Sequence, residues 1–316
     1  MRLEKLQTNR SRTWTRMAML AALLGGVGFT VAETAVVPPH TPKVGAIPKY
    51  PPGMFQPPSP TTIPDDEMGA MIRKGQRIFM HTGELAPQFV GNRLACANCH
   101  LDAGRMPDSA PMWAAFVSYP AYRSKNQHVN TLAERIQGCF TYSMNGKAPP
   151  LGDPVLVALQ SYFQWLATGA EVGSKMMGSG YPKLDQPERE PDYFEGQKVY
   201  AQNCALCHGA NGEGQRSSDG KQVFPPLWGP ESFNWGAGMH RIGTAAAFIK
   251  ANMPFSRGGL LSTQQAWDVA LFMNSHERPQ DPRFAGSVDA TREQFHASDD
   301  SMYGRRFNGH LLGSGR

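Results

Sequence analysis

The hydrophobic pattern of the chain predicts two amphipathic helices of similar length. Residues 154–167 (PVLVALQSYFQWLA) and 263–274 (TQQAWDVALFMN) both place apolar side chains at helical spacing. Before them, residues 36–64 contain ten prolines and predict an extended, polyproline-like arm. Residues 177–191 are rich in glycine and proline and predict a linker, and residues 278–316 form a polar tail. The pattern therefore indicates two helical domains with extended chain before, between and after them.

Each predicted helix has a counterpart earlier in its half of the chain. A glycine stands four positions before an aromatic residue at Gly75 and Phe79, and again at Gly196 and Tyr200. Both pairs lie in segments that also predict helices. A glycine at a helix crossing lets two backbones approach closely because it has no Cβ atom. The repeat resembles that of class I cytochromes c, in which two helices cross closely at such a glycine, and this resemblance implies two close helix crossings. Simple turn glycines are the alternative.

The N-terminus has the three parts of a secretory signal. Residues 1–16 are polar and basic, residues 17–31 are apolar and uncharged, and residues 30–32 (TVA) form a small-x-small cleavage site. The apolar run is shorter than the roughly 20 residues that a spanning helix needs. We therefore expect a cleaved signal peptide over residues 1–32, no stable membrane insertion and a periplasmic location. An uncleaved anchor is the alternative.

The charge of the chain is concentrated in this signal. The formal net charge is +5, of which residues 1–32 carry +4, so the remaining 284 residues carry only +1. Nucleic-acid binding relies on a surplus of lysine and arginine that neutralises phosphates. A nearly neutral body therefore argues against a nucleic-acid partner.

Four of the five cysteines form two clusters with the same spacing. Residues 96–100 (CANCH) and 204–208 (CALCH) are both C-x-x-C-H, the attachment motif of c-type haem. Two thiols at this spacing reach the two vinyl groups of one haem, and the histidine that follows becomes the proximal iron ligand. A redox thiol pair or a zinc site explains the repeated histidine less well. We therefore predict two covalently bound haem c groups, attached by Cys96, Cys99, Cys204 and Cys207 and ligated by His100 and His208.

Each half of the chain, with its predicted helices, its glycine and its haem motif, resembles a class I cytochrome c. The predicted fold is all-α, with two tandem class I cytochrome c domains, a proline-rich N-terminal arm and a C-terminal tail. The predicted divisions are a signal peptide (1–32), a proline-rich extension (33–65), cytochrome c domain 1 (66–172), a linker (173–190), cytochrome c domain 2 (191–277) and the tail (278–316).

The sixth iron ligand decides what each haem does, because a methionine ligand favours electron transfer over chemistry at the iron. For the second haem, Met253 lies 45 residues after His208 and precedes a proline. This position favours Met253 as the distal ligand. Met239, His240 and Lys250 are the alternatives.

Two candidates compete at the first haem. Met144 lies 44 residues after His100, nearly the offset of Met253, whereas Cys139 lies 39 residues after it. Spacing favours Met144. Cys139, however, is the cysteine left over once four have bonded to haem, and an exported protein seldom keeps an idle thiol. An inert buried cysteine or an intermolecular disulfide is the alternative for Cys139.

Several segments are similar to the thiosulfate dehydrogenase family of di-haem c-type cytochromes. The similarity covers about residues 66–277, with one further segment in the tail. The matching segments are 91–94 (GNRL), 100–104 (HLDAG), 135–140 (RIQGCF), 143–146 (SMNG), 233–239 (FNWGAGM), 251–254 (ANMP) and 307–310 (FNGH). The haem subunits of sulfur-oxidising complexes usually carry such a cysteine at the C-terminal haem, where this chain has Met253.

The resemblance implies an enzyme that joins two thiosulfates into tetrathionate, a reaction that some members run mainly in reverse. It implies that Cys139 ligates the first haem and forms a sulfur–sulfur adduct with substrate, with Arg123, Arg135 and Ser143 around it. Lys125 is the alternative to Arg123. Electrons would pass through the second haem to a periplasmic acceptor such as a small cytochrome c.

Two other functions remain open from the sequence. A non-catalytic di-haem electron carrier would use Met144 at the first haem and leave Cys139 inert. A sulfur-transferring haem subunit would need a protein partner and would form no tetrathionate alone.

Overall fold

The computed structural model describes residues 50 and 52–315, so the predicted signal peptide and the start of the proline-rich extension lie outside the described residues. The described chain is mainly helical and has two hydrophobic cores, one built around α1 and α6 and the other around α7, α9 and α10. Within this part of the chain, no helix has the length and apolar character needed to cross a membrane.

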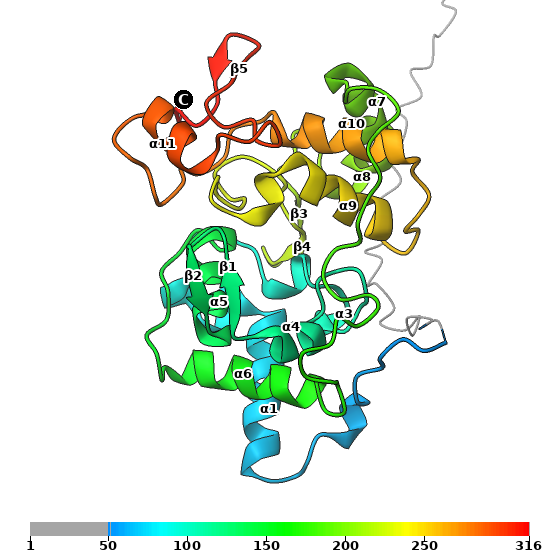
Figure 1. Ribbon diagram of the computed structural model, residues 1–316, viewed down its shortest axis with the longest axis vertical. Coiled ribbons are helices and arrows are strands. Elements are labelled where there is room, and N and C mark those ends of the chain that lie inside the picture. Colours follow the sequence, from blue (N-terminus) through cyan, green and yellow to red (C-terminus); the bar gives the residue numbers. More distant parts are fainter. Residues whose placement is uncertain (1–49, 51, 316) are drawn as a thin grey trace, which may run out of the picture. The chain divides into compact units, whose positions relative to one another are not determined.

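In the first domain, the glycine of helix α1 lies directly against helix α6. A Cβ atom on Gly75 would lie 2.0 Å from the carbonyl oxygen of Ala158, so only glycine fits this crossing (Figure 1). The predicted crossing is therefore confirmed, and the turn-glycine alternative is wrong. The helices of this domain are α1 (Glu67–Met80), α2 (Thr82–Leu85), α3 (Leu101–Gly104), α4 (Met112–Ser118), α5 (Leu132–Gly138) and α6 (Pro154–Leu166), with 3-10 turns at Pro60–Thr62, Pro87–Phe89 and Cys96–Asn98 and a π-helix at Cys139–Ser143.

The second domain has an equivalent crossing of two helices at a glycine. A Cβ atom on Gly196 would lie 2.1 Å from the carbonyl oxygen of Asp268. The C-terminal helix of the crossing spans residues 263–274, as predicted, and Ser262 caps it by accepting a hydrogen bond from the backbone of Gln265. The helices here are α7 (Tyr193–Asn203), α8 (Ala205–His208), α9 (Ile242–Asn252) and α10 (Thr263–Asn274), with a 3-10 turn at Gly238–His240.

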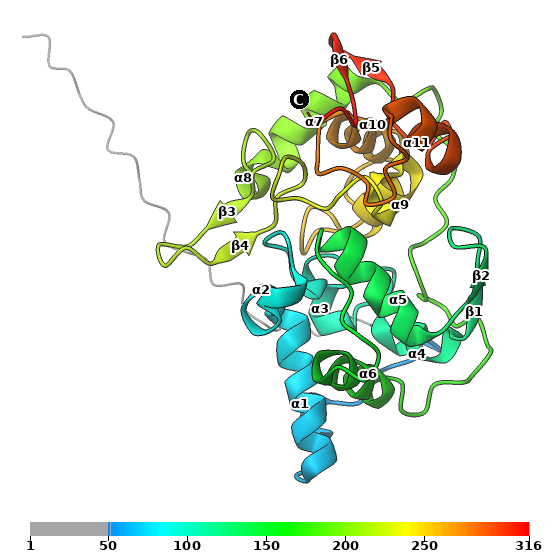
Figure 2. The ribbon, with the colours of Figure 1, turned by 90° about the vertical axis from the view of Figure 1, so that its left-hand side faces the viewer.

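Three short two-stranded antiparallel sheets accompany the helices, although the sequence predicts none. They pair β1 (Ala121–Arg123) with β2 (His128–Asn130), β3 (Gln215–Arg216) with β4 (Gln222–Phe224), and β5 (Arg306–Phe307) with β6 (His310–Leu311) (Figure 2). Each strand has two or three residues. Strands this short show no alternation of apolar and polar residues, so periodicity does not reveal them.

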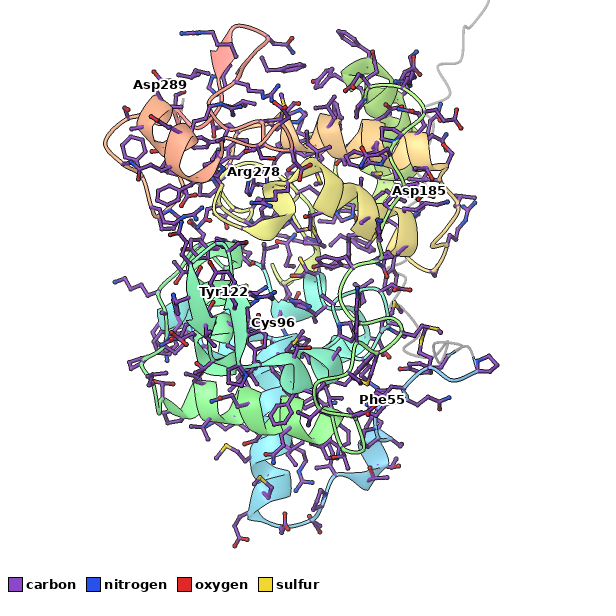
Figure 3. All side chains as sticks on the ribbon, in the orientation of Figure 1. Phe55, Cys96, Tyr122, Asp185, Arg278 and Asp289 are labelled. Carbon is purple, nitrogen blue, oxygen red and sulfur yellow. The ribbon has the colours of Figure 1, made fainter. Side chains whose placement is uncertain are left out.

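The described part of the proline-rich extension lies against the first domain. The ring of Phe55 packs against Trp113 of α4 with 5.1 Å between ring centroids (Figure 3). The guanidinium of Arg105 donates hydrogen bonds to the carbonyls of Pro57 and Pro58, at 3.0 and 2.8 Å. Residues 55–58 are therefore held on the body of the first domain.

The C-terminal tail carries α11 (Val288–Phe295) and encloses a buried polar network. The Asp281 carboxylate is fully buried and accepts hydrogen bonds from Arg283 at 2.6 Å and from His296 at 2.9 Å. His296 in turn contacts His240 of the second domain, with 3.2 Å between their ring nitrogens. The tail thus contacts the second domain through His296, and the buried Asp281 carboxylate holds the other nitrogen of that ring.

Replacing Gly75 by alanine should destabilise the protein, because the new methyl group meets a backbone carbonyl that has no room to move. We expect a loss of at least about 2 kcal/mol in the free energy of unfolding, measured by urea denaturation of the haem-loaded protein. Gly83 in α2 has nothing within 4 Å of its Cβ position. Gly83→Ala is therefore the control and should change stability by less than about 0.5 kcal/mol. Equal stability of both variants would contradict the crossing.

The Asp281 network should make stability depend on pH. Burial by itself raises the pKa of Asp281, but hydrogen bonds from His296 and Arg283 outweigh it and hold that pKa well below its usual range. A depressed folded-state pKa stabilises the fold above about pH 4, and this contribution is lost as the pH falls further.

Asp281→Asn should therefore lower the free energy of unfolding by on the order of 3 kcal/mol at pH 7. The difference in free energy of unfolding between this variant and the unmodified protein should shrink as the pH falls from about 4 to about 3. Urea unfolding at each pH measures this difference. Asp289→Asn, on the exposed face of α11, should show almost none. A gap of constant size over this range would argue against the charge of Asp281 as the cause.

Candidate functional site

The first C-x-x-C-H motif is held by its own turn and by helix α2. Cys96 begins a 3-10 turn in which the side chain of Asn98 accepts a hydrogen bond from the backbone of Ala95 at 2.7 Å. The buried hydroxyl of Thr82 contacts both the backbone nitrogen and the sulfur of Cys96. Nδ1 of His100 donates to the carbonyl of Ala110 at 2.8 Å, which fixes the ring and leaves Nε2 as the nitrogen for a partner in the cavity.

The second motif has the same arrangement. Nδ1 of His208 donates to the carbonyl of Pro225 at 2.9 Å, so Nε2 is again the remaining nitrogen. Burial lowers the pKa of His208 and favours the neutral ring, the form that binds a metal. Both histidines are therefore oriented as iron ligands need to be.

A cavity of about 310 Å³ lies beside the first motif and brings together most of the predicted site residues. Those that line it are Cys96, Cys99, His100, Arg123, Arg135, Cys139, Ser143 and Met144. Apolar side chains, such as those of Phe79, Leu159 and Phe163, form much of the remaining wall. Two thiols, an oriented imidazole and apolar walls fit a covalently attached haem. The cysteines of the motif lie inside the first domain, where Figure 3 labels Cys96.

The Cys139 thiol is the chemically distinct sulfur of this cavity. Arg135 donates a hydrogen bond to its sulfur at 3.1 Å, one turn earlier on the same face. Burial by itself raises the pKa of Cys139, but the Arg135 charge and a hydrogen bond with His100 outweigh it and lower that pKa to about 7. Burial raises the pKa of the Cys96 and Cys99 thiols to about 12. Cys139 is therefore the sulfur that carries negative charge near neutral pH.

Arg123 and Lys125 come from one hairpin but differ in where they lie. Arg123 lines the cavity and donates to the hydroxyl of Tyr119 at 2.8 Å. Lys125 is absent from the lining; its ammonium group donates to the Gly236 carbonyl and lies 3.7 Å from the centre of the Tyr142 ring. Burial of this group, and then the charges of Arg283 and Arg135, lower the pKa of Lys125 to about 7.

The linker supplies part of the cavity, which the sequence analysis missed. Ser179 and Gly180 line it. The Gly180 carbonyl accepts a hydrogen bond from the backbone of Ala110 at 2.8 Å, beside the contact that holds His100. Glycine and proline in this segment are typical of any linker, so its composition carried no signal for a role in the site.

The four candidates for the distal position of the second haem lie in different surroundings. Met253 follows α9 and packs against the second core, as does Cys204. Met239 packs against both cores. The His240 ring contacts Ala237 and His296, and the Lys250 ammonium donates to the carbonyls of Gly259 and Leu261. His240 and Lys250 thus have protein partners for their polar atoms.

Fold and motifs together define a c-type cytochrome with two domains and a thiol in the haem cavity of the first. Two family models agree with this class. Residues 89–172 match the SoxA/TsdA cytochrome c domain, and residues 191–273 match the cbb3-type cytochrome c oxidase subunit III family. The predicted tandem cytochrome c fold, and with it covalently bound haem c, is thereby confirmed.

The chain belongs to the thiosulfate dehydrogenase family. It is 59% identical over 259 residues to the thiosulfate dehydrogenase of Thiomonas intermedia (strain K12), covering 82% of each chain. It is 52% identical over 263 residues to that of Stutzerimonas stutzeri (strain A1501), covering 83% of this chain and 85% of the other. The predicted enzyme class, an oxidoreductase of sulfur compounds, is confirmed with the family.

A solved structure supports the same assignment. Thiosulfate dehydrogenase (TsdBA) from Marichromatium purpuratum, in its as-isolated form, matches with a TM-score of 0.80 and 54% sequence identity. The match covers 83% of this chain and 58% of that chain. This chain therefore corresponds to a little over half of the TsdBA polypeptide.

Proposed function

We propose that this protein is a periplasmic di-haem thiosulfate dehydrogenase. It joins two thiosulfates into tetrathionate, releases two electrons and can also run in the reverse direction. The observation that carries the proposal is the Cys139 thiol, which accepts a hydrogen bond from the Arg135 guanidinium and, with His100, lines a cavity that fits a haem. Family membership supplies the substrate, since the curated relatives bear the name thiosulfate dehydrogenase.

The chain would hold two haems. Cys96 and Cys99 attach the first and His100 ligates it, while Cys204, Cys207 and His208 do the same for the second. The haems, when bound, accept the two electrons that are released when the new sulfur–sulfur bond forms. The described residues fit both groups because each histidine has its Nδ1 committed to a carbonyl.

Cys139 would serve as distal ligand of the first haem and as the nucleophile. Its lowered pKa makes the thiolate available near neutral pH, and the thiolate is the form that bonds to sulfur and to iron. The Cys139 sulfur bonds to the outer sulfur of one thiosulfate, with loss of two electrons. A second thiosulfate then attacks that outer sulfur, tetrathionate forms and the Cys139 thiolate leaves. The protein thus returns to its starting state with charges and electrons balanced.

Positive charge in the cavity would offset the repulsion between two dianionic substrates. Arg135 and Arg123 both line the cavity, and cations placed there before reaction need no rearrangement during it. Ser143 lines the same wall and offers a hydroxyl to a substrate oxygen. Arg123 suits this role better than Lys125, whose ammonium group already binds the Gly236 carbonyl.

Met253 would complete the second haem as its distal ligand. It is the predicted candidate that ends α9 and packs against the same core as Cys204, whereas His240 and Lys250 use their polar atoms elsewhere. A methionine ligand raises the haem potential, which suits the second haem as the exit for electrons. A small periplasmic cytochrome c would then take them from the protein.

Cys139→Ala should abolish turnover without loss of haem. Purified haem-loaded protein should form tetrathionate from thiosulfate with ferricyanide as acceptor, whereas the variant should form none because the nucleophile is gone. Tetrathionate is measured chemically, and haem content by its reduced spectrum. Met144→Leu, which removes the sulfur of the competing ligand candidate in the cavity, is the control and should keep most of the activity.

Full activity in Cys139→Ala would reject this mechanism. Loss of activity in Met144→Leu with retention in Cys139→Ala would favour methionine at the first haem. No tetrathionate from the unmodified protein, together with no oxidation of its reduced haems by tetrathionate, would favour an electron carrier or a partner-dependent sulfur transferase.

Met253→Leu should remove the methionine–iron absorption band of the oxidised protein while both haems stay attached. The leucine side chain has similar volume but no sulfur, so the fold is kept and only the ligand is lost. Met239→Leu is the matched control and should leave the band unchanged. A band that survives in Met253→Leu and disappears in Met239→Leu would assign the ligand to Met239.

A further inference from the structure

The segment that carries Cys139 is a π-helix, and most of its carbonyls are bonded by groups outside it. Within Cys139–Ser143, the backbone nitrogen of Met144 donates to the carbonyl of Cys139 at 2.9 Å, the i→i+5 pattern of this helix type. An α-helix would use i→i+4 bonds along the segment instead. The carbonyls of Thr141, Tyr142 and Ser143 all accept hydrogen bonds from residues far away in the chain.

Asn234, in the second domain, supplies two of these bonds. Its side-chain nitrogen donates to the carbonyl of Thr141 at 2.9 Å, and its backbone nitrogen donates to that of Tyr142 at 3.2 Å. The same side-chain nitrogen also donates to the side-chain oxygen of Asn145 at 3.0 Å. The remaining side-chain oxygen accepts from the backbone of Gly236 at 3.0 Å. Asn234 is fully buried, and both ends of its amide are occupied.

Two further contacts hold the same loop of the second domain against the π-helix. The side chain of Asn92 donates to the carbonyl of Ser143 at 2.9 Å and to that of Ser232 at 3.1 Å, so it bridges the two. A Cβ atom on Gly236 would lie 2.4 Å from the Tyr142 ring. Residues 232–236 therefore pack directly against the segment that places Cys139.

We propose that Asn234 is a positioning residue for Cys139, so that the second domain completes the active site of the first. The inference rests on the proposed role of Cys139 as haem ligand and nucleophile. Asn234 donates hydrogen bonds to the carbonyls of Thr141 and Tyr142 in the π-helix. These bonds keep the segment from relaxing to i→i+4 bonding. Such a relaxation turns Ser143 and Tyr142 relative to Cys139 and moves the sulfur away from its hydrogen bond with Arg135.

Asn234→Ala tests this directly, because it removes the amide that donates to the carbonyl of Thr141. We expect kcat for thiosulfate oxidation to fall about tenfold or more, since small displacements of a reacting group cost this much. The KM should change by less than about threefold, because the substrate-binding arginines are untouched. The thiolate-ligated low-spin signal of the first haem in electron paramagnetic resonance should split or weaken. The methionine–iron band should stay unchanged.

Asn274→Ala is the matched control. Asn274 is also a fully buried asparagine of the second domain, but its amide donates to the carbonyl of Met239 and does not touch the cysteine segment. This variant should keep the first-haem signal and kcat. Unchanged kcat and signal in Asn234→Ala would overturn the proposal, and so would an equal loss of both in Asn274→Ala.

If Asn234→Ala fails to take up haem, Asn234→Ser decides, because its hydroxyl keeps one donor. Asn234→Ser should change the first-haem signal and kcat in the same direction but less. A signal and a kcat equal to those of the unmodified protein would overturn the proposal. The haem signal does not depend on turnover. A protein that lacks thiosulfate oxidation, but whose first-haem signal responds to Asn234 alone, would therefore reject the proposed function and retain the positioning role.

Discussion

At the helix crossing of each domain, a carbonyl oxygen occupies the space in which any residue but glycine would have its Cβ atom. Gly75 and Gly196 allow this approach, to Ala158 and to Asp268. Each glycine lies in a helix that precedes a C-x-x-C-H motif in the chain. The helix that it crosses is the last helix of the same domain. The position of each haem motif therefore depends on how closely two backbones meet at one glycine.

The cavity beside the first motif combines groups with opposing physical needs. Apolar walls suit a haem but raise the pKa of every thiol they bury, as they do for Cys96 and Cys99. Cys139 escapes this effect because Arg135 and His100 stabilise its thiolate. The Arg135 guanidinium, 3.1 Å away, thus helps to stabilise a charged sulfur in a pocket whose walls are largely apolar.

The same segment shows how the two domains act on one site. The loop at residues 232–236 satisfies carbonyls of the π-helix, and Tyr142 of that helix packs against Lys125 and Arg283. Arg283 is in turn paired with Asp281, which holds His296 of the tail. A continuous set of polar contacts therefore runs from the cysteine segment into the C-terminal tail and, through His296, to His240 of the second domain. The contact between Asp281 and His296 is costly to break because both side chains are fully buried.

By itself, the sequence determined the features that depend on near neighbours in the chain. Helical spacing predicted α6 and α10, and the C-x-x-C-H spacing predicted haem attachment, because periodicity and covalent reach are local properties. The leftover cysteine marked a candidate for chemistry but left it in competition with Met144.

Only the tertiary structure decided which distant residues complete the site. Asn234 bonds to the carbonyl of Thr141 across 93 positions, and the Gly180 carbonyl of the linker holds the loop beside His100. The structure also placed Arg123 in the cavity lining and turned Lys125 toward Gly236, although only one residue separates them. Contacts of this kind depend on the paths of loops and on how domains pack, and no regular spacing along the chain encodes them.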